Sequence, residues 1–140
     1  MQVYIGAAVD SSDKAVQVFG TLTCVLKKVV EEATIYNPYA AFSGGVDFSR
    51  SSVRYICDVN NYALDRADLA VFYVCDTPSI GVPYEIARRA EYNKPLIVWY
   101  EATKKAGVYL HNFAYDQIVY SQQQLEEALS KFAQAKIKKG

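Results

Sequence analysis

One acidic residue in the middle of the chain stands where a nucleophile could act. Glu85 follows a cluster of turn-forming residues, 76–81, which separates an apolar run from an amphipathic segment. Ser79 and Gly81 lie where that segment begins as a helix, and the free N–H groups of a helix start favour anions. Glu85 falls in the predicted first turn, where the helix dipole favours the carboxylate form. An ionised carboxylate in this place is either a candidate nucleophile or simply a favourable first-turn acid.

The residues around Glu85 have the pattern of a strand, a helix and a second strand. Residues 69–74 and 96–100 are short apolar runs rich in β-branched and aromatic side chains, which is typical of strands buried on both faces. Between them, apolar residues recur at helical spacing, and we expect Arg88 and Arg89 to point away from the core. Two parallel strands joined by a right-handed helical crossover are the default arrangement of such a unit.

The rest of the chain repeats this alternation. Further strands are predicted at residues 3–8, 34–37 and 117–120, and further helices at residues 14–32, 53–67 and 122–132. The order predicts an α/β fold, a doubly wound, flavodoxin-like (Rossmann-like) sheet of five parallel strands in the order 2-1-3-4-5. We expect it to form a single domain over residues 1–140.

In that strand order a binding crevice forms between the first and third strands, at their carboxyl ends. The first strand ends in Gly6, Ala7 and Ala8, small residues that let a ligand approach the backbone closely. Asp10 follows them and either turns into the crevice or caps the next helix, and we expect the cap. The third strand leads to the turn before Glu85, so the crevice collects small residues, an anion-binding turn and an acid.

The composition limits the possible functions. The 140 residues are 51% hydrophobic and carry no net formal charge, so no broad positive field would hold nucleic acid or an anionic membrane. No apolar run is long enough to span a membrane, and Met1 leads directly towards a strand, so a cytoplasmic protein without a signal peptide is expected. Cys24, Cys57 and Cys75 are predicted to be reduced core residues. A single histidine, His111, argues against a metal site.

Two long connections and the end of the chain are predicted to be irregular. Residues 38–52 are expected to form a loop, because they combine a Ser-Gly-Gly sequence with several aromatic residues. Those aromatic side chains could stack on a flat ligand such as a nucleobase, or pack on the body or on another subunit. Residues 101–112 read as a second loop, and the Lys-rich residues 136–139 as a solvated tail.

Three segments resemble one enzyme family. The sequence PSIGVPYEIARRAEYNKPLI, residues 78–97, resembles the nucleoside 2-deoxyribosyltransferase superfamily, especially its deoxynucleoside 5'-monophosphate N-hydrolase branch. That branch carries a Pro-Ser-Leu-Gly-Val-Gly-Tyr-Glu-Leu-Gly motif followed by Gly-Lys-Pro and a strand. Residues 3–8, VYIGAA, look like the family's first strand, and residues 65–71, DRADLAV, like its helix ending before the third strand. The motif around Glu85 is the most specific of the three.

The resemblance implies a role for several residues. Glu85 matches the family's nucleophile, which attacks C1' of the sugar, and Tyr4 matches a tyrosine that positions the nucleophilic carboxylate. Ser79 matches a serine that binds the 5'-phosphate in the hydrolase branch, where the transferase branch usually has an aspartate. Asn112 falls near the segment through which the family lends residues across a subunit boundary. The implied chemistry is a retaining double displacement through a glycosyl-enzyme.

The sequence departs from the family pattern at three positions. Asn60 stands where the family has a catalytic aspartate, and an amide cannot donate a proton as an acid. Asp58 is a poor replacement because it lies on a different face of the predicted helix. Asp10 stands about where the hydrolase branch has a phosphate-binding arginine, and its charge would repel phosphate. Pro83 replaces a glycine and suits a first helical turn.

These observations together predict the cleavage of a (deoxy)nucleoside 5'-monophosphate to free base and sugar phosphate, without a cofactor. Asp10 favours one alternative, a nucleoside 2-deoxyribosyltransferase that exchanges bases. Asn60 favours another, a non-catalytic module that binds or sequesters a nucleotide. Twelve tyrosines and six phenylalanines are many for one small core, so a homodimer or larger assembly is expected.

Overall fold

Five parallel strands form one sheet in the order β2-β1-β3-β4-β5, which confirms the predicted fold class and topology. The structure is a computed structural model that describes residues 1–8, 12–42 and 47–139. The strands are β1 (Gln2–Ala7), β2 (Thr34–Tyr36), β3 (Leu69–Val74), β4 (Leu96–Tyr100) and β5 (Ile118–Val119). Because β1 and β3 are neighbours, their carboxyl ends meet at the predicted crevice.

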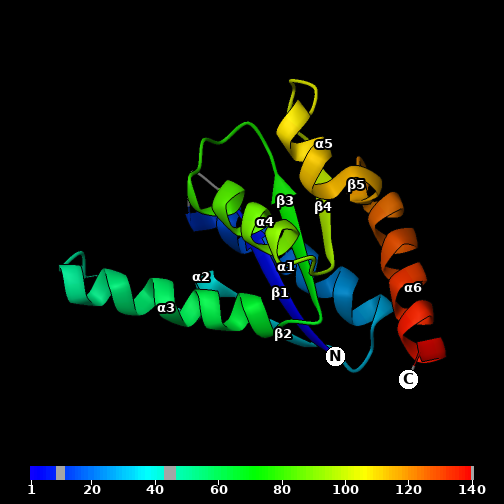
Figure 1. The fold of residues 1–140 in the computed structure, drawn as a ribbon, viewed down its shortest axis with the longest axis horizontal. Coiled ribbons are helices and arrows are strands. Elements are labelled where there is room, and N and C mark those ends of the chain that lie inside the picture. The colour runs from blue at the N-terminus through cyan, green and yellow to red at the C-terminus, as the bar shows by residue number, and fades with distance from the viewer. Residues whose placement is uncertain (9–11, 43–46, 140) are drawn as a thin grey trace.

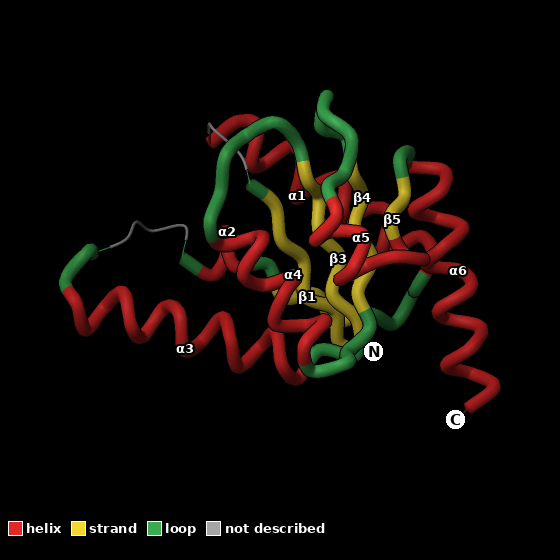
Figure 2. The backbone as a smooth tube through the Cα atoms, turned by 45° about the horizontal axis from the view of Figure 1, so that its top comes forward, coloured by secondary structure: helices red, strands yellow, loops and turns green. Residues whose placement is uncertain are grey.

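Helices cover both faces of the sheet (Figure 1). One face carries α1 (Ser12–Val29) and α6 (Gln122–Lys139), and the other carries α3 (Arg50–Arg66), α4 (Gly81–Glu91) and α5 (Val108–Ala114). Two short elements complete the fold, α2 (Pro38–Ala41) and the 3₁₀ helix η1 (Tyr115–Gln117). Figure 2 shows the same layers, with the central strands β1 and β3 between them.

Each face of the sheet has its own hydrophobic core. Alternate residues of a strand point to opposite faces, so β1 contributes to both cores. Val3 and Ile5 pack with α1 and α6, whereas Tyr4 packs with α3, α4 and α5 and is fully buried. The second core is therefore the one that lies beneath α4, the helix of Glu85.

The two segments predicted as loops contain short helices. α2 begins at Pro38, and the Asn37 side chain caps it by accepting hydrogen bonds from the N–H groups of Tyr39 and Ala40. A capping asparagine before a proline is a helix-start signal, which the nearby glycines outweighed in the prediction. Residues 101–112 likewise include the start of α5 at Val108.

The Lys-rich residues 136–139 are helical rather than irregular, although residues 136–138 are exposed to solvent as predicted. α6 continues to Lys139, and the Lys136 ammonium lies 2.5 Å from the Asp68 carboxylate, which also accepts a hydrogen bond from the Gln2 N–H. This ion pair and hydrogen bond lower the pKa of Asp68. The last helix is thereby tied to the loop between α3 and β3.

The prediction that the cysteines are core residues is wrong. Cys24 and Cys57 are exposed and Cys75 is half-buried, although all three are free thiols. Cys24 lies between core residues of α1, but the helical phase turns it outward. An apolar neighbourhood in the sequence does not decide which face of a helix a residue occupies.

The helix α3 extends beyond the sheet at its amino-terminal end, as both views show (Figures 1 and 2). Of its residues only Leu64, near the carboxyl end, is buried, whereas Tyr55 and Tyr62 are about two-thirds exposed at 65% and 63%. Within residues 1–8, 12–42 and 47–139, no helix is both long and apolar enough to cross a membrane.

Candidate active site

Glu85 and Tyr4 meet between α4 and the sheet. The Tyr4 hydroxyl donates a short hydrogen bond to Oε2 of Glu85, although the two residues are 81 positions apart in the sequence. Tyr4 is fully buried on β1 and Glu85 is half-buried on α4, so the carboxylate points inward. The two residues that the sequence named as nucleophile and positioning tyrosine are therefore in direct contact.

A glycine lies beside this carboxylate. Gly6 lies two residues after Tyr4 on the same face of β1 and pairs with Phe72 of β3. A Cβ atom at position 6 would lie 2.8 Å from Cδ1 of Phe72 and 3.6 Å from Oε1 of Glu85. The first distance would force the Phe72 ring to move, whereas the second is an ordinary van der Waals contact. Gly6 therefore lets the Phe72 ring pack against β1 next to Glu85.

The carboxylate of Glu85 is less ionised than the sequence suggested. Glu85 is the fifth residue of α4, so it lies past the first turn, and burial dominates its electrostatics. Burial raises the pKa of Glu85 to about 7, while the hydrogen bond from Tyr4 lowers it. Near neutral pH, the protonated acid and the carboxylate therefore coexist. Burial and the charge of Glu85 together raise the pKa of Tyr4, which stays a hydrogen-bond donor.

A second tyrosine links the Glu85 pair to Asn60. The Tyr36 ring stacks on the Tyr4 ring, with 5.6 Å between centroids and 19° between planes. Its hydroxyl donates a 2.9 Å hydrogen bond to Oδ1 of Asn60, and burial followed by the charge of Glu85 raises its pKa. Asn60 therefore lies at the end of a chain through Tyr36 and Tyr4 to Glu85. Tyr36 was not predicted as a site residue, although it pairs directly with Tyr4 across β1 and β2.

Asp58 does not take the place of Asn60. It is exposed on α3, two residues before Asn60 and on a different face. The side chain connected to Tyr36 is an amide, which offers hydrogen-bond donors and an acceptor but no acidic proton.

Ser79 and Gly81 lie at the start of α4, as predicted. The Ser79 Oγ accepts a 3.3 Å hydrogen bond from the Val82 N–H, so this side chain caps the helix. Both residues are exposed, and a Cβ atom built on Gly81 meets nothing within 4 Å. The helix start is therefore open to a ligand.

The three small residues at the end of the first strand, Gly6, Ala7 and Ala8, lie in different surroundings. Ala8 lines a cavity beside the helix start, and Gly6 lies beneath Glu85. The Ala7 side chain packs against the core on the opposite face of the sheet, because neighbouring strand residues alternate, so only its backbone is left for the predicted contact with substrate. Asp10 lies outside the described residues.

A cavity of about 210 Å³, here called the α4–α5 pocket, opens between these two helices at the strand ends. Its walls are mainly apolar and come from β1, β3, α4 and α5; they include Ala8, Val74, Val82, Ile86, Leu110 and Phe113. Cys75, Thr77, Ser79, Pro83 and Tyr109 complete the lining. Asn112 also lies on α5, but it is exposed and is not among the residues that line this pocket.

The carboxyl-terminal half of α4 is held by a buried cation. Arg89 is only 1% exposed and donates hydrogen bonds to the carbonyl oxygens of Leu64 and Ala67, both 2.9 Å, and of Pro95. Burial lowers its pKa to about 10, so it remains charged. The prediction that Arg89 points to solvent is wrong, because the carbonyls at the end of α3 need donors that the helix itself cannot supply.

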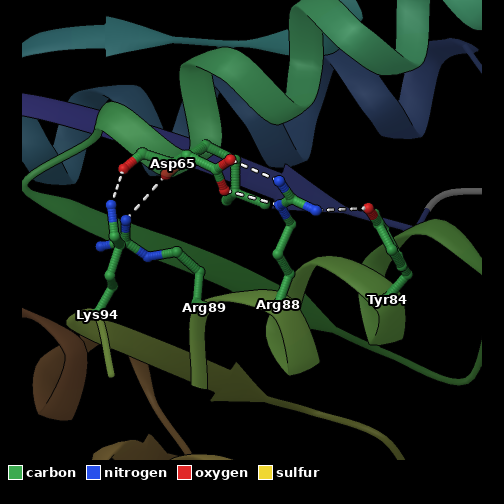
Figure 3. Close-up of polar contacts among 6 residues, drawn as sticks. Asp65, Tyr84, Arg88, Arg89 and Lys94 are labelled. Carbon is green, nitrogen blue, oxygen red and sulfur yellow. Dashed lines mark hydrogen bonds and ion pairs between the residues drawn. The ribbon is translucent and has the colours of Figure 1, made fainter. Parts of the chain in front are cut away.

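The neighbouring arginine forms an ion pair. Arg88 binds both carboxylate oxygens of Asp65 on α3 at 2.7 and 2.6 Å, and also donates to the Tyr84 hydroxyl (Figure 3). The hydrogen bond from Arg88 lowers the pKa of Asp65. Lys94 donates to the Asp65 backbone carbonyl. Together with Arg89, these contacts fix α4 against α3.

No model of a known protein family matches the chain, and no curated protein does. Among solved structures, a 2-deoxyribosyltransferase from the psychrotolerant bacterium Bacillus psychrosaccharolyticus superposes with a TM-score of 0.73 at 14% identity, over 90% of each chain. A conserved protein from Enterococcus faecalis V583 gives the same score and identity, over 94% of this chain and 98% of its own. The CMP N-glycosidase BcmB of Clostridium botulinum gives a TM-score of 0.57 at 12% identity, over 92% and 98%. These likenesses establish the fold, and it is the fold that the family resemblance implied.

Proposed function

We propose that the protein cleaves the N-glycosidic bond of a nucleoside-type substrate, with Glu85 as the nucleophile. The observation that carries this proposal is the half-buried Glu85 carboxylate, held by the Tyr4 hydroxyl beside Gly6 at the crevice between β1 and β3. Support comes from two neighbours of the same fold, a 2-deoxyribosyltransferase and a CMP N-glycosidase. The resemblance of the motif around Glu85 to the nucleoside 2-deoxyribosyltransferase superfamily supports it as well.

The proposed reaction is a double displacement. Tyr4 holds Oε2, and the other carboxylate oxygen, Oε1, forms a bond to the anomeric carbon of the sugar. The bond from that carbon to the base nitrogen breaks, and its electron pair leaves with the base. Water, or a second base, then attacks the same carbon and releases the Glu85 carboxylate; the acceptor loses a proton, and the departed base takes one up. Hydrolysis and base exchange thus share one glycosyl-enzyme and differ only in the acceptor.

A more specific proposal is that the substrate is a nucleoside 5'-monophosphate, which the protein hydrolyses. Ser79 supports it, since its O–H remains a donor after its oxygen has accepted the Val82 N–H. The start of α4 supports it as well, because that helix end is open and favours anions. The pocket beside Ser79 argues against a phosphate, because its described lining residues carry no charge. The nucleoside core is therefore the substrate class that the geometry supports best.

The deciding experiment measures base release from deoxynucleosides, ribonucleosides and their 5'-monophosphates, with and without a free acceptor base. Wild type should release base from at least one of them, and Glu85→Gln should not. Glu91→Gln is the matched control, because Glu91 is an exposed glutamate on the same helix. A covalent sugar adduct on Glu85, found by mass spectrometry of quenched protein, would support the nucleophile directly. Binding of nucleotides without any turnover would favour the non-catalytic alternative.

We also propose that the protein self-associates through α3. This helix extends from the body at its amino-terminal end (Figure 1), and Val53, Tyr55 and Tyr62 are exposed along it. Aromatic side chains are enriched at the buried centres of interfaces. Light scattering at micromolar concentration should give at least twice the monomer mass, and Tyr55→Ser with Tyr62→Ser should lower it. A monomeric wild type contradicts this proposal.

A further inference from the structure

The α4–α5 pocket is an apolar cavity whose wall includes Ile86, the residue after Glu85. Val82 and Ile86 of α4 form one wall, and Leu110 and Phe113 of α5 form the other. Binding sites for whole drug-sized ligands usually span about 300–1,000 Å³, whereas this cavity measures about 210 Å³. It is therefore large enough for one group of a ligand, and the remainder of the ligand must lie outside it.

The alternation of residues along β1 indicates where the pocket lies relative to Glu85. Tyr4, Gly6 and Ala8 are alternate residues and therefore share the face beneath α4. Glu85 contacts Tyr4 and lies beside Gly6, while Ala8 lines the pocket. Two strand residues span about 7 Å, so the pocket begins about that far from Glu85, towards the strand ends. A single small molecule can reach both places.

The lining residues give the pocket a clear chemical character. None of the eleven described residues that line it is charged, and their polar side-chain groups are the hydroxyls of Ser79, Thr77 and Tyr109 and the thiol of Cys75. The Cys75 thiol already donates to the Ala8 carbonyl, and the Ser79 oxygen already caps α4. A phosphate placed among these walls would lose its hydration without gaining an ion pair, which is unfavourable.

We infer that the α4–α5 pocket binds an uncharged, apolar substituent on the sugar of the substrate, such as a methyl or thioether group, rather than a phosphate. The inference rests on the proposed function of Glu85 for the placement of the sugar. An in-line displacement directs the leaving base away from the attacking carboxylate. The pocket lies beside that carboxylate, farther along β1. We expect the end of the bound sugar that carries its exocyclic carbon to lie there. The exocyclic carbon of a pentose then carries the substituent into the pocket.

The first test measures binding without catalysis. It compares ribose that carries a methylthio group on C5 with ribose 5-phosphate, titrated into methyl-labelled protein and followed by NMR. The methylthio sugar should shift the methyl signals of Val82, Ile86 and Leu110 saturably. It should bind about tenfold more tightly than the phosphate, since one apolar group in a fitted pocket is worth about 10-fold or more. These sugars contain no base, so a wrong assignment of Glu85 as nucleophile leaves this result unchanged.

A second test changes the pocket. Tyr109→Ser removes part of the α5 wall and should weaken binding of the methylthio sugar several-fold, whereas Tyr115→Ser, an equally exposed tyrosine outside the pocket, should not. Thr77→Arg places a cation at the pocket and should reverse the preference towards ribose 5-phosphate. Tighter binding of the phosphate sugar by wild type would overturn the inference. So would the absence of any methyl shift with the methylthio sugar, or equal effects of the two tyrosine substitutions.

Discussion

The charged residues in the two halves of α4 differ in how well the protein compensates their burial. In the amino-terminal half, Glu85 is half-buried and its carboxylate accepts one hydrogen bond from a protein side chain, that of Tyr4, among the described residues. Burial raises its pKa to about 7. In the carboxyl-terminal half, Arg89 is almost completely buried, yet three backbone carbonyls accept its hydrogen bonds. Asp65 neutralises the neighbouring Arg88.

This contrast separates the part of the helix suited to chemistry from the part that holds it. One pKa unit corresponds to about 1.4 kcal/mol, so the shift of Glu85 from its ordinary value of 4.5 to about 7 opposes folding of the ionised protein by roughly 3 kcal/mol. The contacts of Arg89 with α3 can offset such a term, because each charged hydrogen bond contributes about 1.5–3 kcal/mol. A poorly solvated carboxylate is also a better nucleophile, which is the use that we propose for it.

The largest expected effect comes from removing the Glu85 carboxylate. Glu85→Gln should lower kcat/KM for base release by about three orders of magnitude or more, because loss of a covalent nucleophile abolishes the double displacement. Far-ultraviolet circular dichroism should show an unchanged fold, since the amide oxygen can still accept the Tyr4 hydrogen bond. Activity within tenfold of wild type would contradict the mechanism.

The next effect concerns stability at the other end of the helix. Arg89→Met should lower the free energy of unfolding by about 3–4 kcal/mol, because it leaves buried carbonyls of Leu64 and Ala67 without donors. Arg88→Met should cost about 1 kcal/mol or less, since its partner Asp65 is a third exposed. Urea unfolding measures both values. Equal losses of unfolding free energy in the two variants would show that the buried contacts of Arg89 contribute no more to stability than the more exposed ion pair of Arg88.

Glu85→Gln should also stabilise the protein, in a pH-dependent way. Below pH 4.5 the acid is protonated in both the folded and the unfolded state, so its ionisation contributes nothing. Between pH 4.5 and 7 the unfolded state releases its proton first, so the stability of wild type falls as the pH rises. The gain of Glu85→Gln over wild type should therefore grow across this window and level off above pH 7, at about 1–3 kcal/mol. Urea unfolding at pH 4.5, 6 and 8 provides the measurement. A constant difference would show that the pKa is not raised.

The sequence predicted the fold and one contact of the site for physical reasons. The alternation of buried strands with amphipathic helices leaves few topologies, which is why the strand order could be predicted. The contact between Glu85 and Tyr4 was implied by the family resemblance of the motif around Glu85 and of the first strand. Tyr36 was missed because its stacking on Tyr4 depends on the register between the edge strand β2 and its neighbour β1. The three residues of β2 are too few for a sequence pattern to determine that register.

Arg89 shows a different limit. It follows Val82 and Ile86 at helical spacing, so the periodicity alone places it on the buried face. The prediction instead followed the general rule that arginine side chains are exposed. The backbone carbonyls that stabilise Arg89 come from α3 and from the residue before β4, and only the tertiary structure brings them there.

The smallest expected effect is a shift in the pH dependence of activity. The proposed nucleophile must be ionised, so kcat/KM should rise with pH through an apparent pKa near 7. The Tyr4 hydrogen bond lowers the pKa of Glu85, so Tyr4→Phe should move this acid limb to higher pH, by about one unit. At pH 7 the variant should therefore lose about fivefold in kcat/KM, and much of this loss should disappear at pH 9. Tyr36→Phe is the matched control: it keeps the ring stacked on Tyr4 but loses the hydrogen bond to Asn60, and its hydroxyl makes no hydrogen bond to Glu85. Its acid limb should stay within a few tenths of a unit of wild type. If Tyr4→Phe leaves the limb in place, or if Tyr36→Phe moves it equally, then the Tyr4 hydroxyl does not set the ionisation of Glu85, and burial alone distinguishes the two halves of α4.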